Sequence, residues 1–274
     1  ICSKIVFNSE WSKNRFLTNL EKIYTKSQKL IVIRQSAEQQ KVDLRKKRNI
    51  ITFVGKLNKA KGYDVFGNAI IDILNKFKNW QAYVIGDEER EKLKFFHKRL
   101  KILGFKKHSD VINIFKKSSI SVVCSRWEEP FGRTSLESAS CGCAVIITNR
   151  GGLPETITNG VILNELSKKS VYTSISNLIK KVKFRKKIQF LSLKNFNLTH
   201  KNASKSIDNY RDEILDSLKQ NKNLNKKLKI LHVTNFNERH NGRLFYNTGK
   251  RINNGFVRLN HSVLEFSDRD IVSY

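Results

Sequence analysis

The fold is decided by residues 127–155, which read WEEPFGRTSLESASCGCAVIITNRGGLPE. Glu129 and Glu137 flank a Phe131-Gly132 turn, and a helix of small residues then leads into an apolar strand and a glycine pair. Carboxylates accept hydrogen bonds from sugar hydroxyls, whereas free backbone N–H groups at a turn and a helix N-terminus receive phosphate. The stretch therefore predicts a site that holds a polyol and a diphosphate together.

Apolar strand-like runs alternate with helical patterns along the chain, which predicts an α/β fold with a Rossmann-like parallel sheet and helices on both faces. A polar segment, 35–49, is interpreted as a linker that precedes the main sheet. Strands are expected at 50–54, 81–85, 100–103, 120–124, 144–148 and 161–163. Helices are expected over 65–77, 88–98, a segment capped by Ser109-Asp110, 133–141, 167–182, 184–193 and 204–219.

Partial Rossmann-like pieces are expected at both ends of the chain. The first has strands at 4–7 and 30–33 with a helix over 10–20. The second follows a polar linker and has a strand at 228–233, a helix ending near 259 and a strand at 261–266. Because the sequence contains no Met and both ends fall within such patterns, we expect an internal piece of a longer protein.

The 274 residues carry 53 Lys and Arg against 24 Asp and Glu, a net charge of +29. Such a charge raises the hypothesis of a basic nucleic-acid or membrane-surface binding module. The excess is mostly lysine spread over the whole chain among many Asn, Ile and Phe residues, which an AT-rich genome favours. We therefore expect no specific nucleic acid partner, and a weak peripheral attraction to anionic membranes as a secondary property.

No apolar run approaches the ~20 residues that span a bilayer, and no signal peptide is visible. A cytoplasmic protein is expected, with peripheral contact at the inner membrane face as a secondary expectation. The four cysteines show neither CxxC nor zinc spacing. We expect buried free thiols at Cys2, Cys124, Cys141 and Cys143.

A second motif joins the predicted strand at 50–54 to the next helix. Its loop reads Gly55-Lys56-Leu57-Asn58-Lys59-Ala60-Lys61-Gly62. Ammonium groups at Lys56 and Lys61 would stabilise the charge that develops on a diphosphate leaving group. A solvated loop in a lysine-rich protein is the structural alternative. For Glu129 and Glu137 the alternative is a favourable position near a helix N-terminus.

Together these segments resemble the donor-binding half of a GT-B glycosyltransferase of family 4, the glycosyl transferases group 1. The family's Val-Gly-Arg-Leu-x3-Lys-Gly loop is matched by residues 54–62, with Lys56 in place of Arg. Its Glu-x7-Glu element is matched by Glu129 and Glu137, and its Gly-x-Pro-Val-Ile strand by residues 142–146, with Ala144 in place of Pro. Its Gly-Gly-x-x-Glu turn is matched by residues 151–155.

The resemblance implies roles for these residues. Catalytic roles fall on Glu129, Lys61 and Lys56, and Glu129 would meet the transferred sugar together with backbone groups of Phe131 and Gly132. Lys56 and Lys61 would hold the diphosphate, Glu137 the ribose hydroxyls, and residues 104–108 the nucleobase. The implied donor-binding set is Gly55, Lys56, Lys61, Gly104, Phe131, Gly132, Arg133 and Glu137.

The expected function is transfer of a sugar from a nucleotide sugar to a glycan or lipid-linked acceptor, with retention at the anomeric carbon, in bacterial surface-polysaccharide assembly. The resemblance implies no metal and no cofactor beyond the nucleotide sugar as co-substrate. Another GT-B enzyme, such as a sugar-nucleotide epimerase, is the second enzymatic hypothesis.

The resemblance also implies an organisation in four parts. Residues 1–36 would be the tail of an acceptor-binding domain, 37–220 the donor-binding domain, 221–227 a linker and 228–274 the start of a second GT-B-like domain, with Asn241-Gly242-Arg243 in its first loop. A tandem transferase is favoured over a circular permutation. Without its acceptor half, the chain alone is expected to be inactive.

Overall fold

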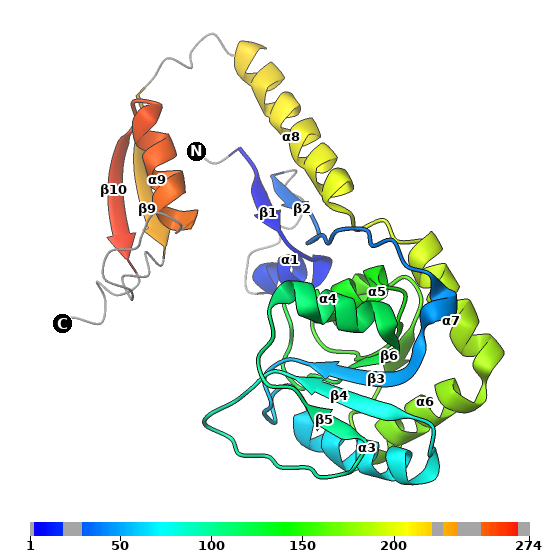
Figure 1. The fold of residues 1–274 in the computed structure, drawn as a ribbon. Helices are drawn as coiled ribbons and strands as arrows, with labels where there is room; N and C mark the ends of the chain where they lie inside the picture. Colours follow the sequence, from blue (N-terminus) through cyan, green and yellow to red (C-terminus); the bar gives the residue numbers. More distant parts are fainter. Residues whose placement is uncertain (1–2, 19–28, 221–226, 235–247, 268–274) are drawn as a thin grey trace. The chain divides into compact units, whose positions relative to one another are not determined.

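The computed structural model describes residues 3–18, 29–220, 227–234 and 248–267, and the chain divides into two compact units, Ile1–Arg211 and Asp212–Tyr274. The first unit is built on a six-stranded parallel sheet in the order β5-β4-β3-β6-β7-β8 (Figure 1). The strands are β3 (Arg48–Val54), β4 (Gln81–Ile85), β5 (Leu100–Ile102), β6 (Ser118–Val123), β7 (Ala144–Thr148) and β8 (Val161–Leu163). The predicted fold class is confirmed.

The strand order contains one reversal of direction. From β3 the chain moves outward to β4 and β5, and it then returns to place β6 on the other side of β3. In open α/β sheets the loops on either side of such a reversal diverge, which leaves a crevice outside the carboxyl ends of the two central strands. The topology therefore predicts that a ligand binds between the loops that follow β3 and β6.

Helices cover both faces of this sheet (Figure 1). One face packs against α3 (Tyr63–Lys76), α6 (Lys168–Lys180) and α7 (Val182–Lys194), and the other against α4 (His108–Lys117) and α5 (Arg133–Ser140). Alternate strand residues serve the two cores: the side chains of Ala144 and Ile146 join the first, and those of Val145 and Ile147 the second. Such continuous apolar strands are what a parallel sheet buried on both faces requires.

Residues 88–98 do not form the helix predicted for them. They form an irregular segment whose side chains contact elements elsewhere in the fold. The Glu91 carboxylate accepts from the Lys59 backbone N–H at 3.0 Å, and the Phe95 ring packs edge-on against Tyr63 with 5.3 Å between centroids. Phe95 also fills the space beside Gly67, where an added Cβ would lie 2.2 Å from the ring. Tertiary contacts therefore override the local helical pattern.

Two further predictions near the sheet were wrong in detail. Helix α4 is not capped by Ser109-Asp110, because it begins at His108 with Lys107 at the N-cap and no side-chain cap bond. Segment 35–49 is packed structure rather than a simple linker. It contains a short 3₁₀ helix, Leu44–Lys46, and the Nζ of the half-buried Lys47 donates to the carbonyl oxygens of Phe115 and Cys141 at 2.8 and 2.7 Å.

Both end pieces have the predicted strand–helix–strand order. The first contains β1 (Ile5–Phe7), α1 (Glu10–Leu17) and β2 (Leu30–Val32), and its two strands are parallel. After α8 (His200–Gln220), the second contains β9 (Lys229–Thr234), α9 (Thr248–Arg258) and β10 (Ser262–Ser267), again with parallel strands. The predicted loop at 241–243 lies outside the described residues, as does most of the 221–227 linker.

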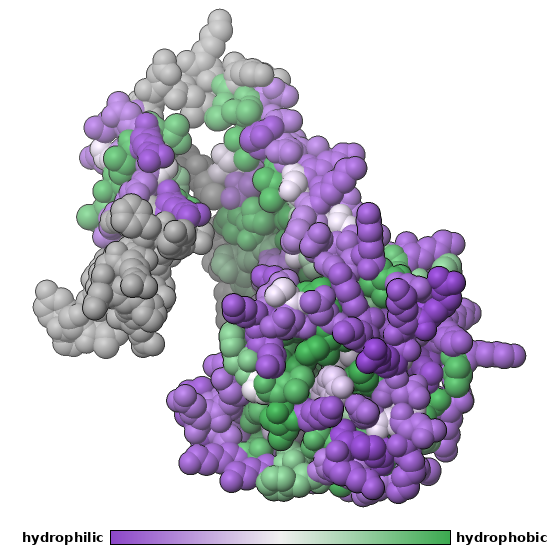
Figure 2. Space-filling view, viewed as in Figure 1, coloured by the Kyte–Doolittle hydropathy of each residue, from purple (hydrophilic) through white to green (hydrophobic). Residues whose placement is uncertain are grey.

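Hydrophilic residues cover much of the face shown in Figure 2, with apolar residues exposed between them. Among the helices of the described ranges, none has the length and apolar character that crossing a bilayer requires.

Three of the four cysteines are buried free thiols, as predicted, and Cys2 lies outside the described residues. Cys141 and Cys143 belong to the core beneath α4 and α5, and Cys124 to the core beneath α3. Burial raises the pKa of the Cys124 thiol from its ordinary 9.0 to about 12, because the thiolate would lose its hydration. Burial raises the pKa of Cys141 to about 12 as well.

These thiols predict a loss of stability in alkali. A folded-state pKa above the unfolded value means that each thiol's contribution is complete below pH 9.0 and is lost as the pH rises towards 12. Between about pH 8 and about pH 10, the free energy of unfolding is expected to fall by about 1 kcal/mol more in the parent chain than in Cys124→Ala. Burial lowers the pKa of Lys47, which changes stability in the opposite direction in both proteins and cancels in the difference. Urea unfolding at several pH values measures this difference, and parallel curves would contradict it.

Candidate functional site

A lysine and a glutamate meet at the crevice between β3 and β6. The Nζ of Lys61, on the loop after β3, forms an ion pair with Oε1 of Glu129, on the loop after β6. The hydroxyl of Ser125 donates to the same oxygen at 3.0 Å. The side chains of Lys61 and Glu129 are 32% and 15% exposed, so the pair is partly shielded but remains reachable from solvent. An ammonium group carries three donors, so Lys61 can bind a further acceptor while it stays paired.

Backbone contacts hold the two loops in this arrangement. The N–H groups of Arg126 and Trp127 donate to the carbonyl oxygen of Ala60 at 2.9 and 3.1 Å. Gly62 then starts α3 with φ +73°, and an added Cβ would lie 1.9 Å from the carbonyl oxygen of Cys124 at the end of β6. Only glycine allows this approach, so the sequence Lys61-Gly62 sets the position of the ammonium group against Glu129.

Lys56 occupies a different position from Lys61, although both lie on the loop after β3. Its side chain is exposed, and among the described residues it has neither a hydrogen bond nor an ion pair. The structure therefore brings Lys61, but not Lys56, into contact with the predicted carboxylates. Lys56 remains an unpaired cation at the same edge of the sheet.

Glycines line the carboxyl edge of β3, β4 and β5. The N–H of Gly55 donates to Ile85 at 3.0 Å, and the N–H of Gly86 donates to Gly104 at 2.9 Å. A Cβ on Gly86 would lie 1.9 Å from the carbonyl oxygen of Gly55. The predicted residues Gly55 and Gly104 therefore belong to a continuous edge without side chains, where a planar group can approach the backbone closely.

The second carboxylate, Glu137, is placed on α5 and has its own basic partners. Its Oε1 accepts a hydrogen bond from Nη2 of Arg133 at 3.1 Å and lies 3.2 Å from Nε2 of His108, the first residue of α4. Glu137 is only 8% exposed, whereas the side chains of Arg133 and His108 are 63% and 66% exposed. The family resemblance implies a nucleobase beside residues 104–108, which include His108, but no sequence motif predicts that His108 contacts Glu137. That contact depends on how α4 and α5 pack.

The predicted turn at Phe131-Gly132 offers backbone groups only. The Phe131 ring is buried in a small core with Ala37, Leu136 and Phe196, and is unable to contact a ligand. Gly132 has φ +115° at the N-cap of α5 and supplies no side-chain cap. The first N–H groups of a helix have no intrahelical partner, so the start of α5 can donate to a ligand oxygen.

Gly151 and Gly152 pack against the backbone of the loop that carries Glu129, whereas Glu155 binds the start of α1. A Cβ on Gly151 would lie 2.2 Å from the carbonyl oxygen of Glu129, and the N–H of Gly152 donates to that oxygen at 2.7 Å. The Glu155 carboxylate accepts from the backbone N–H groups of Glu10 and Trp11 at 3.0 and 2.9 Å, and from Arg34 at 2.8 Å. Both oxygens of Glu155 are therefore bound to the first N–H groups of α1, and one of them also to Arg34.

Comparisons with known proteins point to one family and one fold. The family model described as "Glycosyl transferases group 1" matches residues 34–189. Spore coat protein SA of Bacillus subtilis is 30% identical over 146 residues, which cover 47% of this chain and 39% of that protein. The chain thus spans well under half the length of this curated relative.

Two solved structures share the fold. A glycosyltransferase from Rickettsia africae aligns with a TM-score of 0.65 and 23% identity, covering 78% of this chain and 64% of that one. HepE from Anabaena, solved with UDP and glucose, aligns with a TM-score of 0.60 and 18% identity, covering 78% of this chain and 63% of that one.

Proposed function

Because the chain belongs to the glycosyl transferases group 1 family, we propose that its first unit binds a nucleotide sugar and supplies the donor half of a sugar-transferring enzyme. The observation that carries this proposal is the Lys61–Glu129 pair at the point where the sheet reverses direction. A cation for phosphate and a carboxylate for hydroxyls meet there, at the edge where open α/β sheets bind ligands. HepE, a structural neighbour, holds UDP and glucose.

The proposed donor lies across the carboxyl edge of the sheet. Its diphosphate is neutralised by Lys61, with Lys56 joining it from the same loop, and it accepts N–H groups at the start of α5. Glu137 accepts the ribose hydroxyls through the oxygen that Arg133 and His108 leave open. The nucleobase lies along residues 104–108. In this proposal lysine and helix N–H groups neutralise the leaving diphosphate without a metal.

The transferred sugar lies beside Glu129 in this proposal. Oε1 of Glu129 is bound to Lys61 and Ser125, which leaves Oε2 as an acceptor for a sugar hydroxyl. The diphosphate oxygen leaves as the bond to the anomeric carbon breaks, and Lys61 offsets the charge that develops on it. The resemblance to family 4 adds transfer with retention to a glycan or lipid-linked acceptor.

Ligand binding tests this proposal without requiring transfer. Thermal unfolding of the chain is measured with UDP, GDP and ADP and with their sugars. A ligand at about 100 times its Kd stabilises by about 2.7 kcal/mol, which raises the Tm of a domain of this size by about 5 °C or more. One nucleotide series is expected to produce this shift. No shift with any nucleotide, together with salt-sensitive binding to DNA, would instead support a basic nucleic-acid module.

Substitution Glu129→Gln is expected to separate sugar binding from diphosphate binding. The amide keeps one acceptor oxygen but loses the charge that strengthens a hydrogen bond to a hydroxyl. The nucleotide sugar should therefore bind about tenfold more weakly, whereas the free nucleoside diphosphate should bind equally well or better, because Lys61 is no longer neutralised. Calorimetric titration with both ligands measures the two effects. Equal weakening of both would contradict the assignment of Glu129 to the sugar.

A further inference from the structure

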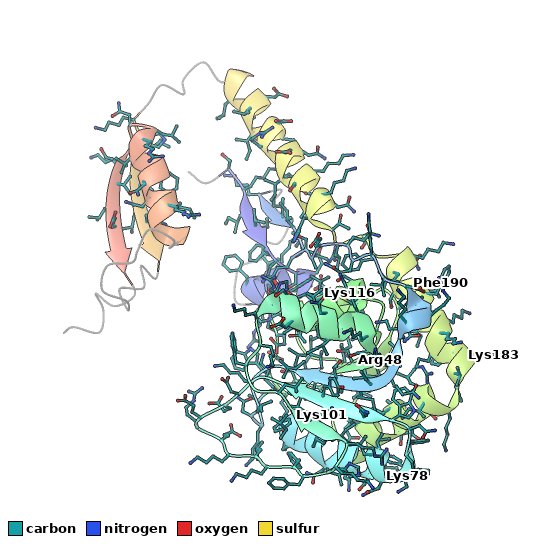
Figure 3. The ribbon with its side chains drawn as sticks, in the orientation of Figure 1. Arg48, Lys78, Lys101, Lys116, Lys183 and Phe190 are labelled. Carbon is teal, nitrogen blue, oxygen red and sulfur yellow. The ribbon has the colours of Figure 1, made fainter. Side chains whose placement is uncertain are left out.

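A second basic site lies at the opposite end of β3 from the donor loop. A pocket of about 820 Å³ is lined by Lys41, Val42, Asp43, Arg45, Lys46, Arg48, Lys116 and Lys117. Arg48 is the first residue of β3, and Lys116 lies in the last turn of α4; Figure 3 labels both. Because β3 has seven residues, its amino end lies about 20 Å from the loop that carries Lys61. The pocket is thus separate from the donor crevice.

The one acidic residue of this pocket is already neutralised. The Asp43 carboxylate accepts hydrogen bonds from Nε and Nη2 of Arg45 at 3.0 and 3.1 Å, and from the Arg45 backbone N–H at 3.0 Å. These contacts lower the pKa of Asp43, so it stays ionised with Arg45 as its partner. Five further cations line the pocket and form no ion pair with a carboxylate of the described residues, although Asp43 also attracts Lys46: Lys41, Lys46, Arg48, Lys116 and Lys117.

The end of α4 does not require the lysines that surround it. Cations often collect at a helix C-terminus because its free carbonyl groups carry negative charge. Here two of those groups are already bound: the Ser118 hydroxyl donates to the carbonyl oxygen of Ile114 at 2.7 Å, and the Nζ of Lys47 donates to that of Phe115 at 2.8 Å. The side chains of Lys116 and Lys117 make no ion pair or hydrogen bond with the described residues, so both can bind a ligand.

We propose that this pocket binds clustered phosphate groups, at a site distinct from the donor crevice. Five unneutralised cations around one concavity match a ligand that presents several negative charges within a few ångströms, and the volume falls in the range of small-molecule sites. Two sources carry this chemistry: a soluble polyphosphate and the head groups of an anionic membrane. The inference does not depend on the proposed transfer of sugar.

The test compares two triple variants of the chain with equal net charge. The pocket variant carries Lys46→Gln, Lys116→Gln and Lys117→Gln. The control variant carries the same change at three exposed lysines elsewhere: Lys78, Lys183 and Lys201. Each protein is titrated with inorganic tripolyphosphate by calorimetry, and is mixed with vesicles of phosphatidylcholine alone or with phosphatidylglycerol added. Lys116 is half-buried and the other five lysines are exposed, and none of the six side chains makes an ion pair within the described residues, so both variants should unfold near the temperature of the parent chain.

Loss of three lysines is expected to weaken binding on the order of 100-fold in the pocket variant, at about fivefold per lysine. A loss at least ten times greater than in the control supports the proposal. If the pocket variant loses binding to tripolyphosphate, the ligand is a soluble polyphosphate. If it loses binding to the vesicles that contain phosphatidylglycerol, the ligand is an anionic membrane. The proposal is overturned if neither probe binds the parent chain, or if the two variants differ by less than tenfold. If tripolyphosphate bound only in the donor crevice, the two variants would differ by less than tenfold, because Lys61 is unchanged in both.

Discussion

Substitution Lys61→Ala is expected to weaken binding of the nucleoside diphosphate by about 10- to 100-fold. A hydrogen bond to a charged group contributes about 1.5–3 kcal/mol, and its loss accounts for that range. The removal also leaves Glu129 without its cationic partner, so that an unneutralised carboxylate faces the diphosphate. Calorimetric titration with the nucleotide selected by the thermal screen measures the effect.

Lys59→Ala is the matched control for this experiment. Lys59 lies on the same loop and carries the same charge, and its backbone, rather than its side chain, makes the contacts with Glu91 and Arg126. General loss of positive charge would weaken binding equally in both variants. Equal effects would therefore contradict a specific role for Lys61, and a change confined to Lys61→Ala would support it.

Substitution Gly62→Ala is expected to destabilise the first unit by about 3 kcal/mol or more. Gly62 has φ +73°, a conformation that costs alanine about 1–2 kcal/mol, and its new Cβ would lie 1.9 Å from the Cys124 carbonyl oxygen. This clash is with backbone at the end of a buried strand, which has little room to move. The loop would have to separate from β6, and Lys61 would move away from Glu129.

Gly104→Ala separates the two causes of that loss. Gly104 has φ +65°, close to that of Gly62, but its Cβ would meet no atom within 4 Å. It should therefore show the conformational cost alone, and urea unfolding should find Gly62→Ala less stable by about 2 kcal/mol. If the two variants were equally stable, close contact between the β3 loop and β6 would not be what fixes the site.

The sequence was most informative where local pattern and tertiary structure agree. The apolar runs that become β3, β4, β6 and β7 are buried on both faces, so their patterns had no competing explanation. Segment 88–98 shows the opposite case. Its charged residues are compatible with a helix. However, Glu91 binds the backbone of Lys59 and Phe95 packs against Tyr63, and a local sequence pattern carries no information about such distant partners.

The candidate site was predictable in part for the same reason. Glu129 and Lys61 each follow a strand, so they could be placed at one edge of the sheet from spacing alone, and the structure brings them into contact. The hydrogen bond from Ser125 to Glu129, and the position of Lys56 away from both carboxylates, depend on the directions of side chains within the loops and could not be predicted in this way. The contacts of Glu137 with His108 and of Glu155 with α1 join segments far apart in sequence, so no short motif could reveal them.

A crystal structure of the chain with its preferred nucleoside diphosphate would show whether the crevice beside Lys61 and Glu129 holds the diphosphate. We expect phosphate oxygens within hydrogen-bond distance of Lys61 Nζ and of the first N–H groups of α5, between the loops that follow β3 and β6. A nucleotide bound elsewhere, with the Lys61–Glu129 pair untouched and that crevice empty, would contradict it.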